Sequence, residues 1–508
     1  MSFPFRRVAG SAALAAVAGL ALFLAGDRQS VLLEVRRQEK LTQADPLENL
    51  PPWTAFSTVA LGAFRGILVD ILWVRAASLQ QEGRYVELVQ LSDWITKLQP
   101  RFAVIWSYHA WNLAYNVSVL FEEPEDRWRW VRHGIHLLRD QGLHYNPGSA
   151  LLYRELALLF EHKIGEDSDR ANGYYKQQWA AEMTDLLGGG RPDWSELTSA
   201  PATRAEWRKT PGAPWMEQQF LEAGIDPFLL PAVDGSLPDR LAALLQTPAG
   251  VALRAHQRVL RLRDEAHLEP ARMREVDEKF GPLDWRLPNT QAIYWAALGL
   301  PYARTDVERA MLERQILQSL THSFLRGRLR FEPEKNLYLL TPNPDVLDRV
   351  RAVYVEALDR QKDELILRSH RDFLVDAVMI CSAFNRLPKA KEVFEELRRR
   401  YPEKIEPKFD SFLEKTYREF VERNSSGETT AAVESAFYQS AYWEAAGDAD
   451  QAAGYDRIAR LIWERYRAAR SDTEQLQRTG LPPLEEFRRA AQDRLREDRK
   501  AAPLKPTR

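Results

Sequence analysis

The amino-acid sequence predicts an all-α protein built from helix-turn-helix pairs that stack side by side into a superhelix. Three observations support this prediction. Apolar residues recur with helical spacing from Trp53 to about Leu187, and again from Asn289 onward. Turn glycines and stop prolines divide these stretches into pairs of helices. Alanine recurs at positions where two helices would approach closely, and such pairs bury their apolar faces by stacking on their neighbours.

The composition describes a folded protein that has no overall attraction for nucleic acid. Its 508 residues are 45% hydrophobic, which is enough to bury a substantial core. Lys and Arg number 70 against 72 Asp and Glu, so the formal charge is -2 and the basic footprint of a DNA- or RNA-binding protein is missing. Cys381, the one cysteine, lies in an apolar run and is expected to be a buried small side chain without a disulfide partner.

The N-terminal segment carries the pattern of a membrane anchor. Val8–Gly26 contains no charged residue and follows Arg6 and Arg7. As a helix it would extend about 28 Å, close to the thickness of a bilayer's hydrocarbon core. We expect an uncleaved transmembrane helix with the large domain on the periplasmic or extracytoplasmic side; a cleaved signal peptide is the alternative. A second apolar run, Phe56–Val74, is expected to be a buried helix of the soluble domain, since Arg65 and Asp70 interrupt it.

Shifts in composition divide the chain into five regions. Gly and Pro punctuate the third of them, and the last is polar and rich in arginine. The expected regions are a membrane anchor with an amphipathic linker (1–50), N-terminal helical repeats (51–187), an irregular Gly/Pro-rich insert (188–288), C-terminal helical repeats (289–470) and a charged flexible tail (471–508).

The first helix pair has the spacing of a known repeat. Its residues at characteristic offsets are Leu72, Ala76, Gly83, Tyr85, Leu88, Ile95 and Pro100. With Gly83 at the turn and Pro100 as the stop, this unit resembles the tetratricopeptide repeat, a 34-residue helix-turn-helix module. It departs from the family pattern at Arg75, where leucine is expected. The resemblance implies a superhelix of stacked helix pairs with a concave binding surface.

Four further units resemble the same repeat. Trp106, Ala110 and Leu113 would form the first helix of the second unit, whose turn would hold the 13-residue excess NVSVLFEEPEDRW. A third unit begins at Tyr153. Two more lie near the end of the chain, where the last has Gly447 at its turn and alanines on its second helix.

Motifs for chemistry are absent from the sequence. It contains no phosphate-binding loop, no dinucleotide glycine fingerprint and no Gly-x-Ser-x-Gly. His109, His133 and His136 could converge on a metal ion, but no His-Glu-x-x-His or cysteine pair supports such a site, and ordinary inter-helix histidines are favoured. The segment GEDSDRANG, with Asp167 and Asp169, fails as a calcium loop and is read as a solvated turn. We therefore expect no metal, no cofactor and no enzymatic activity.

The resemblance to the tetratricopeptide repeat implies a partner-binding groove on the first helices. The matching positions are Trp73, Gln80, Ser107, Trp111 and Tyr115. The last three follow one another at four-residue intervals and so share one helix face. Tryptophan is bulky and usually buried, so the alternative is that these aromatic side chains only fill spaces between helices.

The expected function is that of a membrane-anchored scaffold. Its helical array would bind a protein or peptide partner at the bacterial cell envelope without catalysis. Two alternatives remain open. One is an enzyme that acts on envelope glycan and is built on an α/α toroid; the other is an accessory subunit of a membrane protein complex.

Overall fold

A computed structural model describes residues 64–229, 237–333, 337–360, 363–384, 386–423, 426–469 and 482–498. The chain forms two compact units, Met1–Trp73 and Val74–Arg508, and the described residues from Val74 onward belong to the second. The predicted anchor at Val8–Gly26 lies outside the described residues. Within those residues, each helix is too short or too polar to cross a membrane.

The first predicted helix pair is present. It consists of α3 (Phe64–Gln81) and α4 (Tyr85–Leu98). Gly83 links the helices with a φ of +72°, a left-handed conformation that favours glycine. Leu88 and Ile95 are fully buried, as the spacing predicts. Ile71, in the run Phe56–Val74 expected to be a buried helix, is instead 61% exposed.

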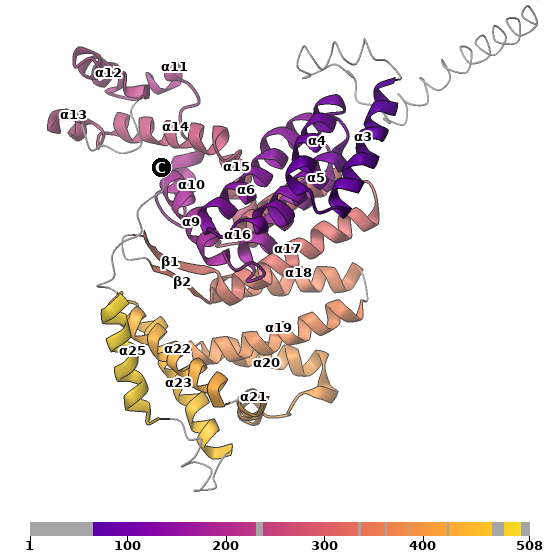
Figure 1. The fold of residues 1–508 in the computed structure, drawn as a ribbon. Coiled ribbons are helices and arrows are strands. Elements are labelled where there is room, and N and C mark those ends of the chain that lie inside the picture. The colour runs from indigo at the N-terminus through magenta and orange to yellow at the C-terminus, as the bar shows by residue number, and fades with distance from the viewer. Residues whose placement is uncertain are drawn as a thin grey trace, which may run out of the picture. The chain divides into compact units, whose positions relative to one another are not determined.

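The second and third predicted pairs are also helical. The eight elements between 103 and 165 form three continuous runs, 103–120, 124–145 and 150–165 (Figure 1). The elements are α5 (Ala103–Trp111), η1 (Asn112–Val117), η2 (Ser118–Leu120), α6 (Pro124–His136), η3 (Leu137–Gly142), α7 (Leu143–Tyr145), α8 (Ala150–Leu158), η4 (Leu159–Gly165) and α9 (Asn172–Leu187). The expectation that NVSVLFEEPEDRW forms one long turn is wrong. Its first five residues continue the preceding helix through η1 and η2, because Val117 and Ser118 are fully buried against neighbouring helices.

The Gly/Pro-rich region folds into short helices and one long one. They are α10 (Trp194–Thr198), α11 (Arg204–Trp207), α12 (Ala213–Glu222), η5 (Pro227–Leu229), α13 (Asp239–Leu244), α14 (Pro248–Asp264) and α15 (Pro270–Phe280). Helices α11 to α14 share a small apolar core around Trp207 and Phe220. The indole Nε1 of Trp207 donates a hydrogen bond to the Ala249 carbonyl at 2.8 Å. The polar atom of this buried side chain therefore has a hydrogen-bond partner inside the core.

The chain then returns to the first helices and continues the array. The remaining helices are α16 (Pro288–Gly299), η6 (Leu300–Tyr302), α17 (Asp306–Arg326), η8 (Pro344–Val346), α18 (Leu347–Arg360), α19 (Glu364–Ala383), α20 (Leu387–Arg400), η9 (Pro402–Lys404), α21 (Phe409–Arg423), α22 (Ser426–Ala445), α23 (Ala449–Ala469) and α25 (Leu484–Asp498). Helix α16 packs on α8, and from there each of α16 to α20 packs on the next (Figure 1). One apolar core runs from Trp106 to Phe412, which is the serial packing expected of stacked helices.

Two features of the second half were not predicted. Strands β1 (Arg328–Glu332) and β2 (Leu337–Thr341) form an antiparallel hairpin in which Arg330 opposes Leu339. Helix α25 lies in the region expected to be a flexible tail, and it packs on α22 through Phe487 and Ala491. Apart from the hairpin, the described residues form helices, turns and loops, so the all-α class is confirmed.

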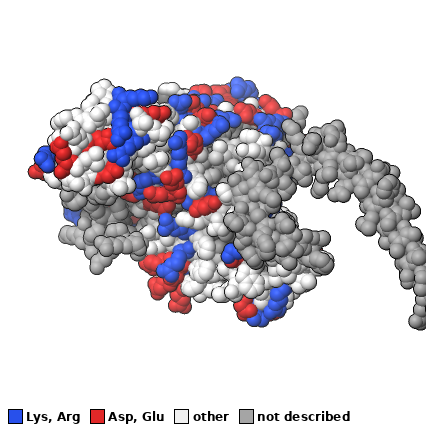
Figure 2. All heavy atoms as spheres, turned by 90° about the horizontal axis from the view of Figure 1, so that it is seen from above, with Lys and Arg blue, Asp and Glu red and all other residues white. Residues whose placement is uncertain are grey.

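The surface mixes both signs of charge. In Figure 2, Lys and Arg side chains alternate with Asp and Glu over the face that is drawn, and no large area of one sign stands out. Cys381 is fully buried on α19, and burial raises the pKa of its thiol to about 11. A protonated thiol without access to solvent is a poor nucleophile.

Candidate functional site

Three helices in the first half of the second unit end in π-helical segments. They are η1 after α5, η3 after α6 and η4 after α8. In η4, for example, the Glu166 N–H donates to the carbonyl of Glu161, five residues back, at 3.0 Å. Such wide turns are rare and are frequently found at functional sites. Segments η1 and η4 contact each other, so their side chains meet.

A stack of aromatic rings crosses from α5 to η4, and we call Trp111, Tyr115 and His162 the aromatic column. The ring centroids of Trp111 and Tyr115 lie 5.5 Å apart, with 24° between the planes. Tyr115 and His162 follow at 5.7 Å, and the Tyr115 hydroxyl lies 3.1 Å from His162 Nδ1. Glu166 Oε2 lies 3.7 Å from the other ring nitrogen of His162. Trp111 is 40% exposed, so its indole ring faces solvent while it stacks on the half-buried ring of Tyr115.

The structure brings together two of the five predicted groove residues. Trp111 and Tyr115 stack directly, and Ser107 is half-buried one turn earlier on α5. Gln80, on α3, accepts a hydrogen bond from the hydroxyl of Tyr108 through its side-chain oxygen. Trp73 is half-buried on α3 and belongs to the first unit of the chain, whereas the other four residues belong to the second.

A buried acid lies in the same π-helical segment as His162. Glu161 is 3% exposed, and its Oε2 accepts a hydrogen bond from the side-chain amide of Gln315 on α17. Burial, reinforced by the nearby charge of Glu166, raises the pKa of Glu161 to about 8. The carboxyl group is therefore mostly protonated at neutral pH.

The segment read as a solvated turn is instead the anchor of a buried ion cluster. Asp169 accepts hydrogen bonds at 2.6 Å from both Arg127 and Lys163, and all three residues are less than 7% exposed. Burial alone would raise the pKa of Asp169, but the hydrogen bonds from Lys163 and from the Ala171 N–H lower it overall. Lys163 Nζ also lies 5.0 Å from the centre of the Tyr115 ring, a cation–π contact that joins this cluster to the aromatic column.

The three histidines considered as metal ligands have different environments. His109 is 3% exposed, and burial lowers its pKa to about 4. His133 stacks on Trp130 with ring centroids 6.0 Å apart, and His136 Nδ1 lies 3.2 Å from a carboxylate oxygen of Asp140. Within the described part of the chain, no group of three or more His, Cys, Asp or Glu side chains is arranged to hold a metal ion.

Burial controls the protonation of the titratable groups beside the aromatic column. Burial and the neighbouring carboxylates raise the pKa of Tyr115, so its phenol stays protonated and serves as a hydrogen-bonding group. Glu161, the one strongly perturbed acid beside the column, is closed to solvent. Spacing alone could not indicate Glu161, Lys163 or His162 as members of the site, because a π turn shifts side chains away from the i, i+4 positions that the pattern assumes.

The fold and this site define an all-helical protein of serially packed helix pairs with a supported, exposed aromatic surface. Comparison with models of known protein families and with curated proteins finds no match to the chain.

Proposed function

We propose that the protein is a non-catalytic scaffold that binds a protein or peptide partner through the aromatic column. The observation that carries this proposal is the exposed ring of Trp111, which rests on the half-buried ring of Tyr115. Tryptophan and tyrosine dominate binding energy at protein interfaces, because they bury much area and lose little conformational entropy when already held in place. Tyr115 is itself fixed by His162 and Lys163, so the anchor is preorganised.

The same proposal includes the kind of array and its location. Positive φ angles at Gly83 and Gly447, between helices of a pair, and buried alanines on the facing helices support an array of the tetratricopeptide type. The uncharged run Val8–Gly26 supports a membrane-anchored protein of the bacterial envelope with its large domain outside the cytoplasm. Alkaline phosphatase fused after residue 60 should be active if this location is correct, and a fusion active only with a cytoplasmic reporter would contradict it.

Site-specific crosslinking tests the binding proposal. A photoreactive phenylalanine derivative in place of Trp111 should give one discrete crosslinked product in the native host. Trp215, 57% exposed on α12, is the matched control position and should give no such product. Tyr115→Ala should reduce crosslinking from position 111, since it removes the support of the column. Equal products from positions 111 and 215, or none from position 111, would refute the proposal.

An enzyme acting on envelope glycan is a second proposal, supported by one observation. Glu161 is an acid whose pKa is raised to about 8, and it lies one residue from a ring of the aromatic column. Glycosidases use a protonated carboxyl group as general acid, and aromatic rings stack on sugars. The burial of Glu161 weighs against this alternative, because substrate could reach it only after the helices move. Hydrolysis of cell-wall glycan that Glu161→Gln abolishes would favour the enzyme.

A further inference from the structure

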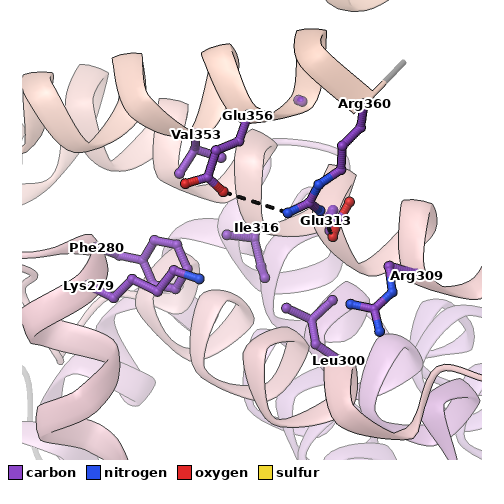
Figure 3. A pocket seen from close by; sticks show the side chains of 10 residues that line it. Lys279, Phe280, Leu300, Arg309, Glu313, Ile316, Val353, Glu356 and Arg360 are labelled. Atoms are coloured by element: carbon purple, nitrogen blue, oxygen red, sulfur yellow. Dashed lines mark hydrogen bonds and ion pairs between the residues drawn. The ribbon is translucent and has the colours of Figure 1, made fainter.

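A small cavity lies between α15, α17 and α18, well along the chain from the aromatic column. Its volume is about 150 Å³. Phe280 and Ile316, each 3% exposed, belong to the main apolar core, and with Leu300 and Val353 they make the interior of the cavity apolar (Figure 3). A cavity of this size holds a group as large as a benzene ring.

Charged side chains surround this apolar interior. Arg360 is paired with two carboxylates, those of Glu313 and Glu356, and its Nη2 lies 3.8 Å from Glu356 Oε2. Lys279 and Arg309 also line the cavity, and neither forms an ion pair with a carboxylate of the described residues. Three cations thus face two carboxylates, which leaves one positive charge in excess.

The two uncompensated cations are well placed to meet a ligand. In Figure 3, Lys279 and Arg309 lie on opposite sides of the cavity, with Ile316 and Leu300 between them. The stem of Lys279 follows the neighbouring ring of Phe280, and its Nζ lies 5.0 Å from the ring centre. This contact holds the ammonium group at the edge of the apolar surface while it remains hydrated.

We propose that this cavity binds a small acid composed of an apolar group and a single carboxylate. The apolar group, as large as a phenyl ring or a leucine side chain, would occupy the space between Phe280, Ile316 and Val353. The carboxylate would lie at the mouth, accept a charge-assisted hydrogen bond from the nearer of Lys279 and Arg309, and be attracted by the positive charge of the other. A single negative charge matches the single positive charge in excess. The acid can be a free molecule or the C-terminal residue of a peptide, since both have this chemistry.

Phenylacetate is a suitable probe for the full-length protein, with its binding followed by ligand-observed NMR and calorimetry. We expect a Kd of about 1 mM or tighter. Phenylacetamide keeps the ring and lacks the charge, and acetate keeps the charge and lacks the ring; each should bind at least about tenfold more weakly. A tripeptide ending in Phe, with a free or an amidated C-terminus, distinguishes the two sources. Tighter binding of the free peptide than of phenylacetate assigns a peptide terminus, and the reverse order assigns a free acid.

Variants then test which side chains are responsible. Lys279→Gln and Arg309→Gln should each weaken phenylacetate binding about tenfold. Arg304→Gln is the matched control, because Arg304 is exposed just before the start of α17 and does not line the cavity. Ala357→Phe should fill the cavity and abolish binding, with helix content by circular dichroism confirming that the variant folds. Equal binding of phenylacetamide, unchanged binding by both charge variants, or no binding of phenylacetate would overturn the proposal.

This proposal is independent of the aromatic column. Trp111→Ala should leave phenylacetate binding unchanged, and Arg309→Gln should leave crosslinking from position 111 unchanged. A failure of one proposal is therefore distinguishable from a failure of the other.

Discussion

Arg127 and Asp169 form an ion pair that is almost completely closed to water, with 2.6 Å between Nη1 and Oδ1 and each residue 6% exposed. The guanidinium group also donates through Nε to the carbonyl of Phe121 at 2.8 Å. Asp169 thus holds the turn before α6 against the loop between η4 and α9. Lys163 adds a second cation to the same carboxylate, so one acid balances two buried bases.

Removal of this carboxylate should be strongly destabilising. Asp169→Asn leaves Arg127 and Lys163 buried without a counter-charge, and breaking a buried pair in this way costs about 3–5 kcal/mol. The urea concentration at the midpoint of unfolding should fall, while the slope of the unfolding free energy against urea concentration stays constant. Asp126→Asn is the control, since Asp126 pairs with Arg129 at the surface, 3.0 Å away, and its loss should cost less than about 1 kcal/mol. Similar midpoints for both variants would show that the cluster is not closed to water.

Glu161 should make the fold less stable in alkaline solution. Its pKa is about 8 in the folded protein against an ordinary value of 4.5, so between these pH values the folded state keeps a proton that the unfolded state has released. Stability therefore falls as pH rises through this window, by an amount on the order of 5 kcal/mol. Glu161→Gln cannot ionise and should flatten the dependence of the unfolding free energy on pH between 5 and 9. Glu122→Gln, at an exposed position, should keep the wild-type curve.

His109 should make the fold less stable in acidic solution. The pKa of His109 is lowered to about 4, mainly by burial. The charge of Asp93 raises it by less, and the nearby His133 lowers it slightly. Between pH 6.5 and 4, His109 binds a proton in the unfolded chain but not in the folded chain. The free energy of unfolding therefore falls as pH falls, by about 3 kcal/mol. His109→Leu should lose less stability between pH 7 and 4 than the wild type, whereas His144→Leu, at an exposed site, should match it. Urea unfolding at several pH values measures the difference.

The helix pairs could be predicted because their signals are local. Gly83 and Gly447 mark turns through backbone conformations that other residues rarely adopt, and both are found with positive φ. Ala377, Ala390 and Phe394 recur at fixed offsets along one unit, and all three are buried. Each of these signals depends only on neighbours within about 40 residues.

The site features escaped prediction because they depend on distant contacts or on rare helix geometry. The π turn in η4 places Glu161 against Gln315, a residue 154 positions away. Asp169 lies in a segment whose polar composition is typical of exposed turns, but it is buried in contact with Arg127, a residue 42 positions away, and with Lys163. The mouth of the cavity combines Lys279 and Arg309 from two different helices, and no sequence spacing relates them.

The junction between the last helix pair and the preceding one should depend on a single glycine. Gly454 on α23 faces Phe384 at the end of α19, and a Cβ at this glycine would collide with three atoms of the phenyl ring. The ring has little room to move, since Phe384 is 7% exposed and packs edge-on against Tyr455 at 5.3 Å. Arg457, one turn further along α23, strengthens the junction by donating to the carbonyls of Ser382 and Ala383.

Gly454→Ala should therefore separate α23 from α19 and destabilise the protein by about 1–3 kcal/mol, the usual cost of overpacking. Because Arg457 depends on the same approach, amide exchange should accelerate in α22 and α23 more than in α8 or α16. Gly173→Ala is the control: no atom lies within 4 Å of its added methyl group, and alanine favours the first turn of α9, so stability should stay equal or rise. If Gly454→Ala were as stable as Gly173→Ala, the close approach of α23 to Phe384 would not contribute to stability, and the last helix pair would be held by its other contacts alone.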